Sequence, residues 1–303
     1  MSRAKRQRDM TGARAAMKVA HWIEPWGEAR FPVDVDHLVR QAHTMYKRDD
    51  PIIEIQGAPW KDFDGFLKRN PDNPKEWLLS YKNTVSDERQ RFTKAHELGH
   101  YILHSQKQDQ FRCGSNAIVE KDTGEENIEA QANQFASYLL MPANHLRPLI
   151  EKTPITLDLI GKLASIYGVS FEAMCIRVVE ITAERAVLVY WDNGMLLRWS
   201  RSDAAKEQRL WLEQPADSEL EPIPGTVAAD ASIRQCPDGE TVPANLWFRN
   251  APEGEMLREM KHTSDTFERV LSLLIVPKFE PRWSRGWEDR EYDTYDRFIE
   301  RGQ

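Results

Sequence analysis

The chain has 303 residues, of which 41% are hydrophobic and 29% are charged, and its formal net charge is −7. This composition is typical of a globular protein, the length leaves room for two domains, and the negative charge argues against broad nucleic-acid binding by the whole chain. Three cysteines at unrelated spacings predict no disulfide framework. The basic first residues lack the apolar segment of a signal peptide, and no apolar stretch is long enough to cross a membrane, so we expect a cytoplasmic protein.

Residues 1–29 are predicted to form a basic arm. Asp9 is the only acidic residue among the first twenty positions, which hold six basic residues. These are Arg3, Lys5, Arg6, Arg8, Arg14 and Lys18. We interpret the arm as a frayed, solvated terminus in preference to a nucleic-acid contact.

A helix and a small sheet are expected next. The helix begins at Asp34 or Asp36, either of which can cap it, and its apolar residues keep helical spacing through Tyr46. Three short strand-like runs follow, beginning at Ile52, Gly65 and Trp77. A second helix is predicted from its N-cap Ser86 to about His104.

The segment that follows this helix is predicted to be a loop and then a third helix. Residues 106–124 are rich in glycine and polar residues, as is typical of a loop. An apolar stripe at helical spacing then runs from about Glu125 to Met141. Pro142 ends this helix.

Two further helices are predicted within residues 156–181. Their boundary residues are the cap Thr156, the terminator Gly168 and the second cap Ser170. The pair has the outline of a helix-turn-helix. Lys162 and Arg177 are almost its only basic residues, however, which favours two helices that close the core over DNA recognition.

The character of the sequence changes near residue 183. Two strand-like runs meet at Asn193-Gly194, a strong predictor of a hairpin turn. Six tryptophans fall in this part, where filling an aromatic core is favoured over lining a ligand pocket. They are Trp191, Trp199, Trp211, Trp247, Trp283 and Trp287. We predict a β-rich α+β domain over residues 183–303, with a charged tail after Trp283 and a regulatory or substrate-recruiting role.

The pentapeptide HELGH at residues 96–100 is the strongest chemical signal in the chain. Positions i and i+4 of a helix lie on one face, so His96 and His100 can bind one Zn²⁺ ion. Glu97 can reach a water molecule at that ion and act as its general base. Two histidines and a carboxylate also suit Mn²⁺.

A catalytic zinc site normally has three protein ligands and one open position. The best candidate for the third ligand is Glu129, in the segment IEAQANQFASYLLMP, and its rivals are Glu125 and Glu126. Asn133, four residues after Glu129 on the same helical face, can accept the remaining ring N–H of a ligating histidine.

Three nearby residues allow alternative interpretations. His104 repeats the i+4 spacing and could extend the row of ligands, but a structural position near the helix end is favoured. Cys113, between the two metal helices, is interpreted as an ordinary loop cysteine, although a thiolate there could cap the open metal position and hold the site latent. Gly99 indicates a close approach between its helix and a neighbouring backbone.

The paired segments RFTKAHELGHYILH and IEAQANQFASYLLMP resemble the ImmA/IrrE family of metallopeptidases, which are of gluzincin type, over roughly residues 30–181. The resemblance implies a mainly helical zincin-like domain with a small β-sheet, placed here at residues 30–182, within an α+β chain. It implies that His96, His100 and Glu129 bind the metal and that Glu97 is the catalytic carboxylate.

The chain departs from thermolysin-like gluzincins at Asn133, where those enzymes have aspartate. Asparagine orients an imidazole but polarises it less, so weaker or conditional activity is expected. Many relatives also carry an N-terminal DNA-binding helix-turn-helix, which this sequence does not predict. Gluzincins usually add a side-chain donor for the oxyanion. Tyr101, Tyr138 and His145 are conceivable donors.

The resemblance further implies a cytoplasmic, zinc-dependent endopeptidase that cleaves a helix-turn-helix repressor or an antitoxin-like regulator. Direct nucleic-acid or membrane binding is not expected, and the sequence predicts no oligomeric state. Two alternatives remain. One is a metal-stabilised protein that sequesters its partner without proteolysis. The other is a DNA-binding regulator that uses residues 156–181 and the basic arm.

Overall fold

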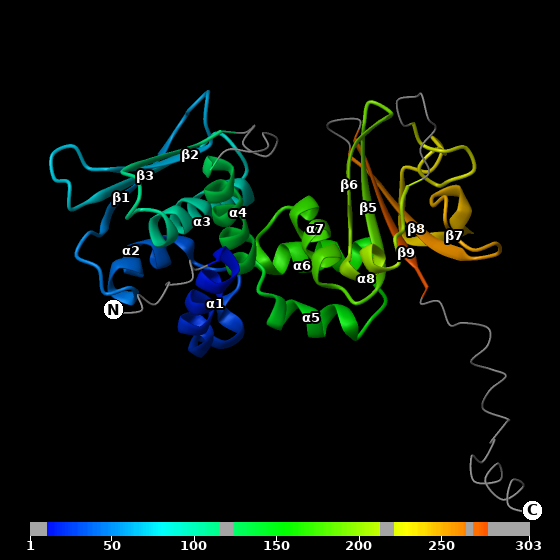
Figure 1. Ribbon diagram of the computed structural model, residues 1–303, viewed down its shortest axis with the longest axis horizontal. Coiled ribbons are helices and arrows are strands. Elements are labelled where there is room, and N and C mark those ends of the chain that lie inside the picture. Colours follow the sequence, from blue (N-terminus) through cyan, green and yellow to red (C-terminus); the bar gives the residue numbers. More distant parts are fainter. Residues whose placement is uncertain (1–10, 115–123, 213–220, 265–268, 278–303) are drawn as a thin grey trace, which may run out of the picture.

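The computed structural model describes residues 11–114, 124–212, 221–264 and 269–277. One end of the molecule holds most of the helices and a four-stranded sheet, and the other end holds a five-stranded sheet, with helices α6 (Leu157–Tyr167) and α7 (Phe171–Ile181) between them (Figure 1). This mixture of helices and two sheets agrees with the predicted α+β class. The division into domains near residues 30 and 183 stays a prediction.

The N-terminal segment differs from the expected solvated arm. Thr11 caps helix α1 (Gly12–Ile23), and a 3₁₀ segment (Glu24–Arg30) follows it. The buried residues of α1 recur at helical spacing and pack against helix α4 (Gly124–Leu140). They are Gly12, Ala15, Ala16, Val19 and Ile23. The expectation of a frayed terminus is therefore wrong for residues 12–23, while residues 1–10 lie outside the described part.

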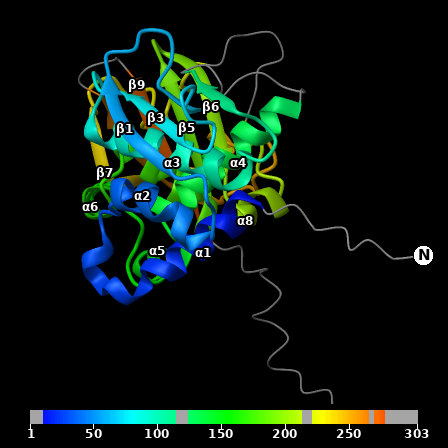
Figure 2. The same ribbon diagram turned by 90° about the vertical axis from the view of Figure 1, so that its left-hand side faces the viewer.

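The four-stranded sheet lies over two helices. Its strands are β1 (Ile52–Ala58), β2 (Gly65–Arg69), β3 (Trp77–Lys82) and β4 (Gln110–Cys113), in the order β1-β3-β2-β4. The β1–β3 pairing is parallel and the other two are antiparallel. Helix α2 (Val35–Met45), which Asp34 caps, and helix α3 (Asp87–Leu103) cover one face of the sheet (Figures 1 and 2). Edge strand β4 falls inside the segment expected to be a loop.

Helices α3 (Asp87–Leu103) and α4 (Gly124–Leu140) form the centre of this half. Ser86 caps α3 as predicted, through a hydrogen bond that its side chain accepts from the Arg89 amide. The two helices approach closely at Gly99, where a Cβ atom would lie 3.2 Å from the Cα of Ala132. The close approach predicted for Gly99 is thus confirmed. It brings one face of α4 against the histidine face of α3.

A charged network joins the sheet to the last turn of α3. Asp50 accepts hydrogen bonds from Arg48 (2.6 and 2.7 Å), Arg69 (3.0 Å) and the Trp77 indole (3.0 Å). Arg48 also donates to the Tyr101 carbonyl at 2.8 Å, and its guanidinium lies 4.1 Å from the centre of the Tyr101 ring. Burial alone raises the pKa of Asp50, but the hydrogen bonds from Arg48 and Trp77 and the charges of Arg48 and Arg69 lower it to about 2. The network therefore fixes α3 against the sheet.

Helices α5 (Ala143–Glu151), α6 (Leu157–Tyr167) and α7 (Phe171–Ile181) lead to the second sheet. Thr156 and Ser170 cap α6 and α7, and Gly168 adopts the left-handed conformation between them, as predicted. Within the described residues, no single helix is both long and apolar enough to cross a membrane; α6 and α7 reach that composition only together, and they are bent by 109°. Arg177 is 1% exposed and donates to the Met141 carbonyl.

The second sheet is antiparallel throughout. It consists of β5 (Arg185–Asp192), β6 (Met195–Arg201), β7 (Gln235–Pro243), β8 (Met256–Thr263) and β9 (Arg269–Val276), in the order β6-β5-β9-β8-β7. The predicted hairpin is confirmed, since Asn193 (φ 51°) and Gly194 (φ 77°) join β5 to β6. Short helix α8 (Asp203–Glu207) and a 3₁₀ turn (Ala244–Leu246) complete the described elements of this half.

The two faces of this sheet belong to different hydrophobic cores. One face packs against α6 and α7 and is continuous with the core of the helical half. Its residues are Ala186, Leu188, Tyr190, Met260, Leu271, Leu273 and Ile275. The opposite face forms a separate cluster that includes Trp191 and Trp247, whose ring centres lie 6.1 Å apart. These two tryptophans fill a core as expected; Trp211 is 55% exposed, and Trp283 and Trp287 lie outside the described residues.

Candidate metal centre

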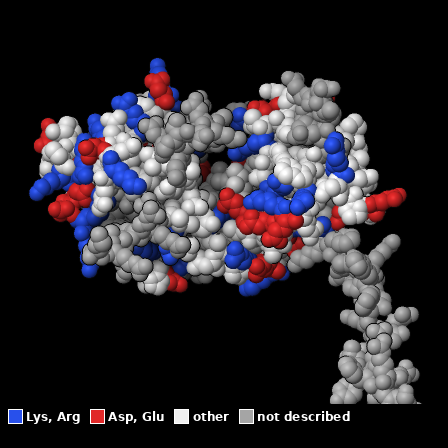
Figure 3. Space-filling view, viewed as in Figure 1, with Lys and Arg blue, Asp and Glu red and all other residues white. Residues whose placement is uncertain are grey.

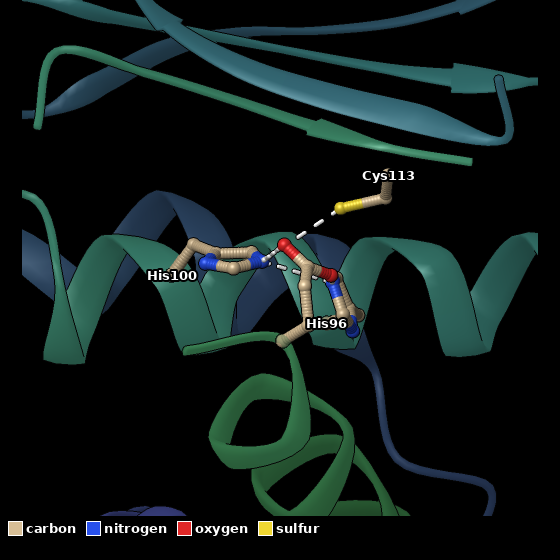
Figure 4. A group of neighbouring side chains, drawn as sticks. His96, His100 and Cys113 are labelled. Atoms are coloured by element: carbon tan, nitrogen blue, oxygen red, sulfur yellow. Dashed lines mark hydrogen bonds and ion pairs between the residues drawn. The ribbon is translucent and has the colours of Figure 1, made fainter. Parts of the chain in front are cut away.

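Helix α3 presents two histidines on one face. His96 and His100 lie one turn apart, and their Nε2 atoms face each other at 2.9 Å. Both side chains are buried beneath the sheet, as Figure 4 shows. Ring nitrogens directed at a common point are the arrangement that two ligands of one cation require.

Helix α4 adds a carboxylate at the same point. One oxygen of Glu129 lies 3.1 Å from His96 Nε2, and the other lies 3.1 Å from His100 Nε2. The close packing of α3 on α4 at Gly99 brings these groups together. The structure therefore places Glu129 beside both histidines; the side chains of its rivals, Glu125 and Glu126, lie outside the described part.

The remaining nitrogen of each imidazole also has a partner. His96 Nδ1 lies 2.9 Å from Asn133 Oδ1, which can only accept, so Nδ1 is the donor of this hydrogen bond and Nε2 is the nitrogen left for a metal ion. His100 Nδ1 lies 3.1 Å from His104 Nδ1, and His104 Nε2 lies 3.4 Å from the side-chain oxygen of Gln131. Asn133 lies where the sequence places it. His104 is turned away from the ligand row and supports the ring of His100.

A fourth candidate ligand reaches the site from the sheet. Cys113, the last residue of β4, is buried, and its Sγ atom lies 3.7 Å from His100 Nε2 (Figure 4). Ligand atoms of His96, His100, Glu129 and Cys113 all lie within 4.8 Å of one another. The interpretation of Cys113 as an ordinary loop cysteine is therefore wrong. The residue lies in strand β4, which was not predicted because the surrounding segment, residues 106–124, is rich in glycine and polar residues.

Glu97 is completely buried between α3 and the sheet. Within the described residues, neither of its carboxylate oxygens has a hydrogen bond of normal geometry. A Cβ atom on Gly65 of β2 would lie 2.8 Å from Glu97 Oε1, so the glycine leaves the space that the carboxylate uses. Burial raises the pKa of Glu97 to about 7, against the lowering effects of the His96 charge and the Cys113 thiol.

The other groups of the site have displaced pKa values as well. Burial lowers the pKa of His100 to about 4, although Glu129 opposes the shift, so this imidazole is neutral at neutral pH. Burial has the same tendency at His96, but the hydrogen bond that His96 donates to Glu129 and the charges of Glu97 and Glu129 raise its pKa. Burial raises the pKa of Glu129 too, yet its hydrogen bonds to the two histidines lower it well below the usual range. Burial and the two nearby carboxylates raise the pKa of the Cys113 thiol.

The residues fit a zinc ion. With Zn–N near 2.0 Å and Zn–S near 2.3 Å, the ligand atoms of a tetrahedral site lie roughly 3.3 Å apart for two nitrogens and roughly 3.5 Å apart for nitrogen and sulfur. The separations here are 2.9 Å between the histidine nitrogens, 3.1 Å from each nitrogen to Glu129, and 3.7 Å from His100 to Cys113. A small outward movement of side chains would accommodate the ion.

Comparison with known proteins assigns the segment that contains these residues to a family. Residues 48–179 match the model of the IrrE N-terminal-like domain, a peptidase family designated M78. This segment belongs to the ImmA/IrrE family. A solved structure described as a Mycobacterium tuberculosis transcriptional regulator has a TM-score of 0.51 and 15% identity, covering 86% of this chain and 75% of that chain, which shows a similar fold alone. No curated protein matches the chain.

The three residues that the sequence offers as oxyanion donors all make contacts outside the metal cluster. The Tyr101 hydroxyl donates to the Asp50 carbonyl at 3.0 Å. The Tyr138 ring lies under Arg177, at 3.9 Å from its guanidinium carbon. His145 Nδ1 lies 2.5 Å from the Tyr167 hydroxyl. The structure brings none of them into the metal cluster.

Proposed function

We propose that the chain is a zinc-dependent endopeptidase that cleaves a specific regulatory protein, with His96, His100 and Glu129 as metal ligands. One observation carries this proposal: three ligand atoms from α3 and α4 converge at 2.9 to 3.1 Å beside the buried carboxylate of Glu97. Mn²⁺ is the alternative metal, because two histidines and a carboxylate suit both ions.

Each residue of the site has a separate role in the proposed hydrolysis. A zinc ion held here supplies a Lewis acid that polarises the scissile carbonyl and makes a water molecule more acidic. Glu97 accepts the proton of the attacking water and delivers it to the leaving amine. Asn133 and His104 hold the two imidazole rings in the orientation that directs Nε2 inward. The sheet above the site excludes bulk water from the Glu97 carboxylate.

The class of substrate is proposed from the family resemblance. ImmA/IrrE relatives imply a helix-turn-helix repressor or an antitoxin-like regulator as the target. The five-stranded sheet, which carries no comparable cluster within its described residues, would then recruit the substrate or sense a signal. Its shared core with α6 and α7 supports such a role, since a movement of the sheet would change the packing of the helices in contact with it.

The test is incubation of the zinc-loaded protein with a helix-turn-helix repressor encoded beside its gene. We expect defined fragments, and Glu97→Gln should lower the rate by at least about 100-fold because it removes the general base. Glu151→Gln, at an exposed position on α5, is the matched control and should cleave normally. A Glu97→Gln protein that cleaves as fast as wild type contradicts the proposal.

Sequestration of a partner without proteolysis is the second candidate. It is favoured by the Cys113 thiol, because a site with four protein ligands is typical of structural zinc. A stable complex with the repressor, unchanged by Glu97→Gln and giving no fragments, would support it.

A DNA-binding role is weaker. Arg177, one of the few basic residues of the α6–α7 pair, is buried, and on the face in Figure 3 basic and acidic side chains are interspersed. Gel shifts at moderate salt would test it, since phosphate-driven binding is steeply salt-dependent.

A further inference from the structure

Strand β4 is aligned so that its inward face lies over the two histidines. Its residues alternate between exposed and buried positions, with Phe111 and Cys113 turned toward α3. The Phe111 ring stacks on His100, with centroids 4.6 Å apart and planes at 21°. Two residues along a strand cover roughly 6.6 Å, close to the 5.4 Å of one helical turn, so Cys113 is carried from above His100 toward the neighbouring turn of α3.

The backbone holds Cys113 in this position. Its carbonyl accepts the amide of Asp64 at 2.8 Å, and Cys113 pairs directly with Gly65 across the β2–β4 ladder. Gly65 has no side chain to fill the space beneath the ladder, and that space holds the Glu97 carboxylate. The thiol and the catalytic carboxylate therefore share one small buried volume on the sheet side of the metal cluster.

We propose that Cys113 is a fourth ligand that closes the metal centre and keeps the peptidase latent until the sulfur leaves. The proposal rests on the proposed function for its consequence, but the ligand assignment stands on its own geometry. The Cys113 Sγ to His100 Nε2 distance of 3.7 Å is within about 0.2 Å of the nitrogen–sulfur separation of a tetrahedral zinc site. A catalytic site needs the corner that the sulfur would occupy for water and substrate.

We call the bond between the Cys113 sulfur and the metal the latch. Its opening is a simple ligand exchange. When the metal binds, the Cys113 thiol releases its proton to solvent and a sulfur–metal bond forms. When the latch opens, that bond breaks, a water molecule takes the vacated position, and the thiolate accepts a proton from solvent. No electron is transferred, so the exchange needs no oxidant or reductant. Movement of edge strand β4, which has a neighbour on only one side, would be sufficient to withdraw the sulfur.

The ligand assignment is tested by replacing zinc with Co²⁺ in the full-length protein. A thiolate ligand gives Co²⁺ an intense charge-transfer band in the near ultraviolet, so we expect this band in wild type. It should disappear in Cys113→Ala while the weaker visible bands of bound Co²⁺ remain. Cys175→Ala, which changes another buried cysteine in α7, is the matched control and should keep the band. A wild-type spectrum without the band, or a Cys113→Ala spectrum that retains it, overturns the proposal.

A second measurement needs only wild-type protein and applies if Cys113→Ala binds no Co²⁺. Alkylation by iodoacetamide is followed cysteine by cysteine, with Zn²⁺ or with a chelator. Zn²⁺ should slow the reaction of Cys113 by about tenfold or more, since a coordinated thiolate is not free to attack. Cys236, on β7, serves as an internal reference and should react at the same rate in both conditions. Zinc-independent alkylation of Cys113 counts against the latch.

Cleavage of the repressor separates this proposal from the proposed function. With saturating zinc, Cys113→Ala should cleave at least about tenfold faster than wild type, and Cys175→Ala should match wild type. A charge-transfer band that depends on Cys113, together with no cleavage by any variant, keeps the ligand assignment and overturns the peptidase. Cleavage at equal rates by wild type and Cys113→Ala keeps the peptidase and overturns the latch.

Discussion

Substitution of Gly65 by alanine should displace the catalytic carboxylate. A Cβ atom at this position would lie 2.5 Å from Thr93 Cγ2 and 2.8 Å from Glu97 Oε1, whereas ordinary contacts begin near 3.4 Å. The methyl group of Thr93 must therefore retreat by about 0.9 Å and the carboxylate oxygen by about 0.6 Å. Overpacking of this kind costs about 1 to 3 kcal/mol of folding free energy. Misplacement of a catalytic group by about 1 Å can lower turnover by about 100-fold, so the shift of about 0.6 Å at Glu97 should lower turnover by somewhat less than that.

Urea unfolding and repressor cleavage are measured on the same preparations. The double variant Gly65→Ala/Thr93→Ser removes the closest contact, so its stability should recover in part while its cleavage rate stays low, because the clash with Glu97 persists. Gly161→Ala is the control, since a Cβ atom there meets nothing within 4 Å, and it should raise stability by up to about 1 kcal/mol. A Gly65→Ala protein that unfolds and cleaves like wild type refutes the position assigned to Glu97.

Three further predictions concern the network and the ligands. Asp50→Asn should lower the free energy of unfolding by about 2 kcal/mol, because the folded pKa of Asp50, about 2, lies below its unfolded value of about 3.9. That contribution is complete above about pH 4 and is lost as the pH falls toward 2, so urea titrations of wild type and variant should converge there; a constant difference contradicts it. Asn133→Ala should weaken zinc binding by about 10- to 100-fold, measured by competition with a chelating dye, and Asn133→Asp should restore it. Glu129→Ala should lose stoichiometric metal in elemental analysis, and full retention would show that another residue is the third ligand.

Local sequence signals predicted most of the helical half. Helix caps, helix terminators and hairpin turns depend on contacts within a few residues, so they can be predicted from the local sequence. Examples are the caps Ser86 and Ser170, the terminator Gly168 and the turn at Asn193-Gly194. Helix α1 was not predicted, because the six basic residues among the first twenty positions indicate a solvated arm, although the apolar residues of α1 recur at helical spacing. Strand β7 was missed because Pro237 and Gly239 resemble turn residues; they lie where its pairing with β8 is irregular.

The candidate site was predicted in part for a similar reason. His96 and His100 lie on one helical turn, so their convergence follows from helix geometry alone. The position of Glu129 depends on how α4 packs at Gly99. The sequence spacing of Glu129 and Asn133 indicates a ligand on α4, but it does not give the distance from Glu129 to the histidines. Cys113 could not be placed, because its strand is four residues long and acquires its register from β2, some forty residues away in the sequence. The role of Gly65 is likewise visible only once the helix and the sheet are side by side.

The hydrophobic core that runs from the helices into one face of the five-stranded sheet has a practical consequence. A fragment ending near residue 182 would expose the apolar sides of α6 and α7 to water and would tend to aggregate. Heating the intact chain should accordingly melt both halves in a single calorimetric transition. Any signal that loosens the sheet would lower the thermal stability of the helices that hold the histidines.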